Sequence, residues 1–469
     1  MKRLSIMLMA LLAGCANYTP KPLDPSGQQA ALESRRLDAP EVRQFFERSL
    51  GREFTAWPPK AWDINALTLA AYYFHPDLDR AQAQRLVAEA AIVTAGARPN
   101  PTAGVSFQRN MDAPAGQSPW TNGLGLDIPI ETAGKRDYRI ERAGHLAQAA
   151  KLREAEAVWH VRSRVRASLL AAYPTETLVR HQRDLQEGIA KILERRFAVG
   201  FASQPDLTQA HLTLNRALLA LRENQKRSAE NLARLAAAVG VSAAAIDGAA
   251  ISFDAFEQLP PAAALPPAEM RRQALLSRPD VLAVLADYEA SQSALQLEIA
   301  KQYPDISLGP GYLWDAGQVK WSLGLSLVLP LLNRNEGPIA EAKARREEAA
   351  ATFLAVQAKA IAEVDEALAG YGHAIQMFET ADALLQDQQK NERAVAAAFK
   401  AGEADRLAWL SAQYQTVTAE LARINALSQA QQSLGRLEDA LRRPIGAYAL
   451  AVTAEQVIES KSHRDGERP

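Results

Sequence analysis

The sequence has a single cysteine, no excess of charge of either sign, and no apolar run in its body of the roughly 18 residues that a membrane-spanning helix needs. One cysteine makes no disulfide within the chain and no CxxC metal site, so Cys15 is free, catalytic or modified. The 53 basic and 54 acidic residues give a net charge of −1, without the basic tract that follows a phosphate backbone. We therefore expect no nucleic-acid partner.

Catalytic and metal-binding motifs are missing as well. The seven histidines have neither an HExxH pattern nor another paired metal-ligand spacing. Residues 133–136 (AGKR) resemble a phosphate loop only superficially, because the upstream glycine and the following Ser or Thr are missing. Glu347 and Glu348 form a carboxylate pair, but they lie on a predicted exposed helix without a pocket signature. The sequence thus predicts no enzyme, no cofactor and no bound metal.

The first 15 residues have the layout of a bacterial export signal. Two basic residues precede an apolar run over residues 4–12. The LAGC that follows resembles the lipobox, in which the cysteine is acylated and becomes the first residue of the mature protein. We therefore predict a signal peptide at 1–14 and lipidation at Cys15. By the same resemblance, Ala16 implies the outer membrane, because an aspartate there retains lipoproteins at the inner membrane.

Both ends of the mature chain are predicted to lie outside the repeated body. Residues 15–62 are rich in proline and read as a lipidated tether, interrupted by one short helix over 40–50 that Gly51 would end. One face of that helix would pack on the body through Val42, Phe45, Phe46 and Ser49. Residues 451–469 form a C-terminal tail, which we expect to be disordered from Lys461 onwards because it is charged and has no apolar period.

The body contains an internal repeat. Four landmarks match in the same order between the two halves, among them Pro101 with Pro304, an offset of 203 residues. Each half reads as helix, strand, turn, strand, very long helix, turn and helix. We therefore divide the body into a first repeat at 63–260 and a second at 261–450.

Four segments of about ten residues alternate between apolar and polar residues, which is the period of a half-exposed strand. They lie near residues 102–110, 120–130, 305–314 and 319–330. In the fourth, Trp321 and Leu323 point to one side and Ser322 to the other. Such a length suits a tilted strand that crosses a bilayer with its apolar side toward lipid. Two hairpins packed on a soluble core would show the same pattern, but the export signal and the lack of a second sheet favour the membrane.

Four strands are too few for a closed membrane barrel, since the smallest have about eight. Open sheet edges do not occur in hydrocarbon, so we expect several copies of the chain to share one barrel. The turns within the two strand pairs, at 112–119 and 315–318, would then face outside the cell.

A long helical segment follows each strand pair, at 135–199 and 336–400. At 1.5 Å per residue, an unbroken helix of this kind would be about 95 Å long, which exceeds the width of a globular core. Alanine-rich stretches with charged flanks suit a thin-walled tube of coiled-coil helices better than a solid bundle. Pro174 predicts a kink or break in the first segment. Gly200 and Gly402 predict the turns at the far ends.

The two turns carry similar motifs, FAVGFASQPDL at 197–207 and FKAGEADRLAWL at 399–410. Together with the repeat, the strand prolines and NRNEGPIAEAKA at 333–344, they resemble the TolC-type outer membrane efflux protein family over about residues 60 to 445. The resemblance implies a mainly α fold with a small β part, in which a homotrimer forms a 12-stranded β-barrel continuous with an α-helical barrel across the periplasm. It also implies tips that meet a periplasmic adaptor, which couples the duct to an inner-membrane pump.

The same resemblance implies which residues of the tips are functional. The adaptor-binding surface would consist of Phe197, Gly200, Ser203, Asp206, Leu207, Phe399, Gly402, Asp405 and Leu407. Family members often carry an acidic residue in the second tip helix that rings the closed aperture, and here the position that matches Asp206 is Ala408. The aperture candidates are therefore Asp206, Glu403 and Asp405.

Two functions remain open from the sequence. The first is a passive trimeric duct, the outer membrane channel component of a tripartite efflux system. The alternative is a non-conducting coiled-coil envelope lipoprotein with a structural or adhesive role, which conductance in a planar bilayer would distinguish. Metal cations, drugs and solvents all stay open as cargo: the NRNEG stretch resembles the heavy-metal efflux branch, but it also occurs in members whose cargo is organic.

Overall fold

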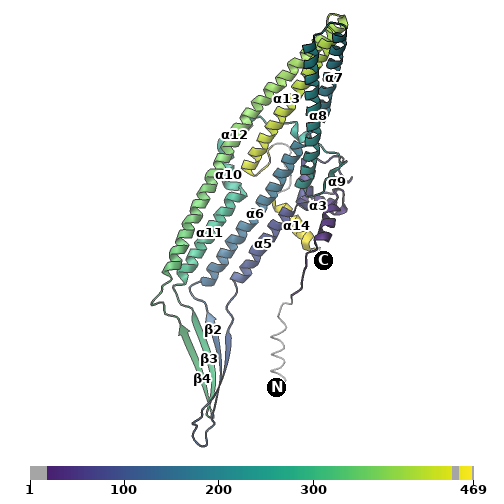
Figure 1. Ribbon diagram of the computed structural model, residues 1–469. Coiled ribbons are helices and arrows are strands. Elements are labelled where there is room, and N and C mark those ends of the chain that lie inside the picture. The colour runs from purple at the N-terminus through teal and green to yellow at the C-terminus, as the bar shows by residue number, and fades with distance from the viewer. Residues whose placement is uncertain (1–17, 446–453, 467–469) are drawn as a thin grey trace.

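The computed structural model describes residues 18–445 and 454–466, and the molecule is strongly elongated (Figure 1). A β-sheet forms one end, long helices lead away from it, and the chain narrows to a helical tip at the opposite end. The short helices of the N- and C-terminal segments lie beside the middle of this shaft. In the part of the chain that the structure describes, no helix is both long and apolar enough to cross a membrane.

The sheet has four antiparallel strands in the order of the sequence. They are β1 (Thr102–Arg109), β2 (Trp120–Ile130), β3 (Ile306–Asp315) and β4 (Gln318–Leu327). All four predicted strands are present, and β2 pairs with β3, so the two halves of the chain share one sheet. β4 ends at Leu327, before the predicted residue 330, because its last partner is Ile306, the first residue of β3.

Four helices adjoin the strands and pack in the order α5 (Pro76–Ala95), α6 (Lys135–Ala171), α11 (Pro279–Ala300) and α12 (Glu336–Ala401). The tip end of the shaft is made by α7 (Glu176–Ala198), α8 (Gln204–Val239), α13 (Arg406–Leu441) and the second half of α12 (Figure 1). Helix, strand, strand, long helical segment and helix thus follow one another twice along the chain.

The first long segment is broken where Pro174 interrupts it. α6 ends at Ala171 and α7 begins at Glu176. α8 supplies hydrogen bonds at the break: Asn231 Nδ2 donates to the carbonyl oxygen of Ala171 at 2.5 Å. The second long segment has no proline after its first turn, and α12 continues for 66 residues without interruption. The predicted kink or break is therefore a break, in one half only.

The hydrophobic core lies around the middle of the shaft. Its main cluster packs α3 (Pro40–Leu50) and α4 (Ile64–Phe74) against α6 and α8. A second cluster joins Met270 of α10 (Pro267–Ser277) to α12 and α13. The connections of this region contain the short helices α9 (Ala243–Ile246), η1 (Asp254–Phe256) and η2 (Ala262–Ala264).

The N-terminal segment is more structured than the predicted tether. The expected helix over 40–50 is α3, its four predicted residues are buried, and Gly51 ends it in the left-handed conformation. A second helix, α2 (Pro25–Glu33), was not predicted. It forms because Asp24 accepts hydrogen bonds from the backbone N–H groups of residues 26 and 27, and a proline occupies the first helical position.

The C-terminal segment also differs from its prediction. The sequence predicts disorder from Lys461 onwards, but α14 (Ala454–Gly466) continues as a helix through residue 466. Val457 is buried in the main core, and Lys461 Nζ lies 2.8 Å from the carboxylate of Asp79 on α5. Composition alone missed these contacts, because they depend on elements far away in the sequence.

Candidate functional site: an amphipathic sheet and a helical tip

One face of the sheet is apolar and exposed in the single chain. Paired residues of antiparallel strands share a face, and Leu124 pairs with Tyr312, which pairs with Trp321. The Tyr312 and Trp321 rings make an edge contact with centroids 5.0 Å apart. Trp321 is 80% exposed and Leu323 75%, although both are large apolar side chains. An apolar surface of this extent needs a lipid or protein covering.

The opposite face of the sheet carries small and polar residues. One row across all four strands consists of Gly104, Gly125, Gly311 and Ser322. The outer strands β1 and β4 each have one neighbour in the sheet, so each presents one unpaired edge. The sheet thus has an apolar face, a polar face and two open edges, so its backbone pairing is incomplete in the single chain.

Polar contacts around a buried lysine fix the sheet to the helices. Lys135, the first residue of α6, is buried, and its Nζ donates to Tyr303 O at 2.6 Å and to Asp305 Oδ1 at 2.7 Å. The backbone N–H of Thr132 donates to the same oxygen of Asp305 at 3.0 Å. These contacts join the exit of β2 to the entry of β3, and sequence reasoning missed them because the partners are 168 to 173 residues apart.

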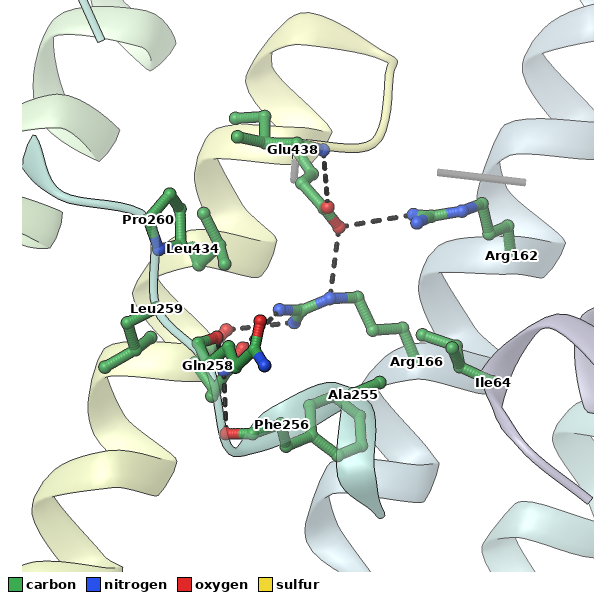
Figure 2. Close-up of a pocket in the computed structure, with 12 residues that line it drawn as sticks. Ile64, Arg162, Arg166, Ala255, Phe256, Gln258, Leu259, Pro260, Leu434 and Glu438 are labelled. Atoms are coloured by element: carbon green, nitrogen blue, oxygen red, sulfur yellow. Dashed lines mark hydrogen bonds and ion pairs between the residues drawn. The ribbon is translucent and has the colours of Figure 1, made fainter. Parts of the chain in front are cut away.

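A second buried polar cluster joins α6 to α13 near the middle of the shaft (Figure 2). Glu438 Oε2 lies 3.2 Å from Arg162 Nη1 and 3.0 Å from Arg166 Nε. Arg166 also donates to the backbone and the side-chain oxygens of Gln431, at 2.9 and 3.0 Å. The cluster lines a cavity of about 180 Å³. Because its partners come from the two halves of the chain, it ties the halves together.

The first tip turn has the capping geometry that its sequence predicts. Gly200 adopts φ +79° and ends α7, and Ser203 caps α8. The Ser203 backbone N–H donates to Asp206 Oδ2 at 3.0 Å, while the Asp206 N–H donates to Ser203 Oγ at 3.3 Å. These bonds form a capping box, and the hydrogen bonds from Ser203 lower the pKa of Asp206. Leu207 follows on the first turn of α8 and is half-buried.

The second tip turn repeats the helix stop but uses a different cap. Gly402 adopts φ +80° at the end of α12, and Asp405 caps α13 by accepting the N–H of Ala408 at 2.8 Å. That backbone bond, followed by a bond from Arg196, lowers the pKa of Asp405. Leu407 is half-buried, whereas Glu403 in the turn is exposed.

Three further tip residues, Arg196, Trp409 and Phe201, lie outside the set predicted from the sequence. Arg196, near the end of α7, donates from Nη2 to Asp405 Oδ2 at 2.5 Å, which links the two helical hairpins. Trp409 stacks on Phe399 with ring centroids 5.1 Å apart. Phe197 is 39% exposed and Phe201 84%, so the first turn presents aromatic rings to the outside. Arg196 directly precedes the FAVG motif, but only its partner in the fold reveals its role.

The structure therefore distinguishes the predicted tip residues by what they contact. Asp206 and Asp405 cap helices, and the two glycines make the turns. Asp405 is in contact with the other hairpin through Arg196. The predicted lipidation site, Cys15, and the signal peptide lie outside the described residues.

Residues 71–241 and 270–441 match the family model of the outer membrane efflux proteins. The matched ranges contain the four strands and nearly all of the long helices. The chain belongs to the outer membrane efflux protein family and lies in the outer membrane.

Individual proteins show the same relationship. The pyoverdine export outer membrane protein OpmQ of Pseudomonas aeruginosa is 26% identical over 401 residues, which cover 78% of this chain and 81% of OpmQ. The cobalt-zinc-cadmium resistance protein CzcC of Cupriavidus metallidurans is 26% identical over 339 residues, covering 69% of this chain and 77% of CzcC. The CmeC outer membrane channel of Campylobacter jejuni has a similar fold, with a TM-score of 0.66 at 18% identity over 96% of this chain and 98% of CmeC.

Proposed function

We propose that this chain is the outer membrane channel component of a tripartite efflux system, a passive duct made by three copies. The observation that carries the proposal is the sheet with one apolar face and two open edges. Three such sheets joined edge to edge give a barrel of 12 strands with no free edge, whereas a single copy would leave unpaired backbone groups in hydrocarbon. The helices would then continue as a trimeric α-helical barrel.

Several parts of the proposal follow from the repeated order of elements and from the motifs. We assign residues 63–260 and 261–450 to two tandem repeats that each contribute two strands and one tip hairpin. Cys15 is the proposed lipid attachment site, which would add acyl chains to the barrel as a membrane anchor. The duct itself performs no chemistry in this proposal: the inner-membrane pump supplies the energy.

We place the contact with the periplasmic adaptor at the helical tip. The exposed rings of Phe197 and Phe201 support this assignment, because exposed aromatic residues are typical of protein interfaces. The aperture acids stay a proposal. Asp206 and Asp405 have roles as helix caps, which leaves Glu403 as the candidate without a role in a cap.

Planar-bilayer conductance tests the duct against the alternative of a non-conducting envelope lipoprotein. Purified trimer should give discrete conductance steps, whereas a spacer or adhesin would give none. A monomeric, detergent-free and water-soluble form of the mature chain would overturn the proposal. The relatives' names mention pyoverdine export and resistance to cobalt, zinc and cadmium, so growth of a deletion strain across metals and organic compounds is the experiment that assigns the cargo.

A further inference from the structure

One row of directly paired residues is polar on every strand. At the end of the sheet nearest the hairpin turns, Gln108 of β1 pairs with Thr121 of β2, Thr121 with Asp315 of β3, and Asp315 with Gln318 of β4. The side chain of Lys320, two residues further along β4, reaches this row. We call these five residues the outer collar.

The outer collar lies on the polar face of the sheet. Strand side chains alternate between faces, so Thr121 points away from the face that holds Trp120. The same alternation separates Lys320 from Trp321 on β4. If three chains form the proposed duct, the outer collar therefore faces the lumen at its extracellular mouth. The inference rests on the proposed function in this respect.

The one carboxylate of the outer collar, that of Asp315, is paired. Lys320 Nζ lies 2.7 Å from Asp315 Oδ2, and Thr121 Oγ1 donates to Asp315 Oδ1 at 2.8 Å. Lys320 comes from β4 and Thr121 from β2, so Asp315 is held from both sides. The side chain of Asp315 is 36% exposed and that of Lys320 51%, which leaves both charges accessible to a passing solute.

The two rows below the row of Asp315 carry no charged residue except Lys320. The next row holds Ser106, Gly123, Leu313 and Lys320, and the one after it holds Gly104, Gly125, Gly311 and Ser322. A Cβ atom added at Gly104 or Gly125 would meet nothing within 4 Å, and neither residue has the positive φ that requires glycine. Packing within the chain thus does not demand glycine there, although glycine weakens a strand.

Charges on this face are correspondingly few. Along the four strands, the polar face carries Asp315 and Lys320 at one end and Asp127, paired with Thr102, at the other. Each chain thus contributes two carboxylates and one ammonium group to the barrel wall. Without Lys320, the same wall would carry carboxylates alone.

We propose that Lys320 is a specificity-determining residue of the duct, which neutralises Asp315 at the extracellular mouth and so keeps the barrel weakly selective between cations and anions. A mouth with three ion pairs lets organic and inorganic solutes of either charge leave. Three unpaired carboxylates would instead favour cations and repel anionic cargo.

The reversal potential of the purified trimer in a planar bilayer under a KCl gradient tests the proposal. K320Q should raise the ratio of K⁺ to Cl⁻ permeability on the order of two- to fivefold at about 0.1 M salt, and D315N should lower it. The K320Q/D315N double variant should return close to the wild type. All shifts should shrink near 1 M salt, where screening is about threefold shorter in range.

Arg109 offers a matched control. It pairs with Trp120 at the same level of the sheet but on the apolar face, and its guanidinium lies 5.6 Å from the Trp120 ring centroid. R109Q removes one positive charge per chain, as K320Q does, and should leave the reversal potential unchanged. A shift in R109Q equal to that in K320Q would overturn the proposal.

The outcomes separate the inference from the proposed function. If the wild type conducts but neither K320Q nor D315N moves the reversal potential, Lys320 has no such role, while the duct stands. If no variant and no wild-type trimer conducts, the proposed duct itself fails, and the inference fails with it. If the K320Q trimer does not insert into the bilayer, D315N still tests the same ion pair, because it should change the ratio of K⁺ to Cl⁻ permeability in the opposite direction.

Discussion

Arg196 of α7 donates a hydrogen bond to the carboxylate of Asp405, the N-cap of α13, with Nη2 and Oδ2 2.5 Å apart. The two residues are 209 positions apart and belong to different hairpins of the tip. The same carboxylate accepts the N–H of Ala408, so one side chain both starts a helix and holds the neighbouring hairpin. The shape of the tip and the stability of α13 are therefore coupled at Asp405.

Substitutions at this pair should separate the two roles. Asp405→Asn keeps a capping acceptor but loses the ion pair, and Arg196→Ala loses the ion pair alone. Both should raise single-channel conductance by loosening the tip, with little change in unfolding temperature, since exposed ion pairs contribute less than about 1 kcal/mol. Asp405→Ala should in addition cost about 1 kcal/mol of helix stability.

Lys191→Ala is the matched control for this prediction. Lys191 pairs with Glu187 within α7 itself, at 2.6 Å, and links no second hairpin. Its loss should leave conductance as in the wild type. Wild-type conductance in Arg196→Ala would show that the link between the hairpins does not restrain the tip.

Glycine at the second tip turn should be required for its backbone conformation alone. A Cβ atom at Gly402 would meet nothing within 4 Å, but its φ of +80° disfavours other residues. Gly402→Ala should cost about 1–2 kcal/mol, whereas Gly370→Ala, in the middle of α12 and equally free of close neighbours, should stabilise the helix by up to about 1 kcal/mol. Thermal unfolding of both variants measures the difference. If both substitutions changed the unfolding temperature in the same direction, the requirement for glycine at position 402 would not come from its backbone conformation.

The buried cluster around Glu438 predicts a large stability effect. The side chains of Glu438, Arg162 and Arg166 are at most 8% exposed. Glu438→Ala leaves two buried guanidinium groups without their carboxylate and should cost about 3–5 kcal/mol. Asp387→Ala breaks the exposed pair with Lys390, whose side chains are 75% and 72% exposed, and should change stability by less than about 1 kcal/mol. Equal unfolding temperatures for the two variants would contradict this ranking.

Features that depend on neighbouring residues were predictable from the sequence. The strands show a two-residue period, the tip turns combine glycine with a capping residue, and Pro174 marks the break between α6 and α7. Each of these signals acts within a few residues of the chain. The Asp24-Pro25 start of α2 is a local signal of the same kind, and the prediction of a tether overlooked it.

Contacts between distant segments were not predictable in this way. Glu438 meets Arg162 across 276 positions, and Lys135 reaches Asp305 across 170. The charged composition from Lys461 onwards predicts disorder, whereas α14 continues through residue 466 and is held by Val457 in the core and by the ion pair of Lys461 with Asp79. A charged sequence folds when the rest of the protein supplies the partners, and no pattern within the segment shows this.

His75 predicts a pH dependence of stability. Its Nδ1 accepts the N–H of Asp77 at the start of α5, at 3.2 Å. Burial, followed by the charge of Arg164, lowers the pKa of His75, with Lys461 adding to this and Asp77 and Asp79 opposing it. Because the folded-state pKa lies below the unfolded value near 6.5, the unfolded chain binds the proton first as the pH falls. Stability should therefore decrease as the pH falls below about 6.5.

His75→Asn tests this dependence, because asparagine can still cap α5 but does not titrate. Thermal unfolding at pH about 7.5 and at pH about 5.5 gives the stability that each protein loses at the lower pH. The loss should be smaller in His75→Asn than in the wild type, and both should unfold at similar temperatures at the higher pH. An equal loss in both proteins would assign the pH dependence to other groups.

Neighbouring residues of β4 test which face of the sheet meets lipid. Leu323 lies on the apolar face and Ser322 on the polar face, with pairing partners Pro310 and Gly311 on β3. In the proposed duct, Leu323→Lys would place an ammonium group in hydrocarbon and should destabilise the barrel by about 2–4 kcal/mol near the bilayer midplane, whereas Ser322→Lys would point into the water-filled lumen and should assemble normally. Heat-dependent dissociation of the trimer measures both. Normal assembly of Leu323→Lys together with failure of Ser322→Lys would reverse the sidedness of the sheet, and the outer collar would then face lipid instead of the lumen.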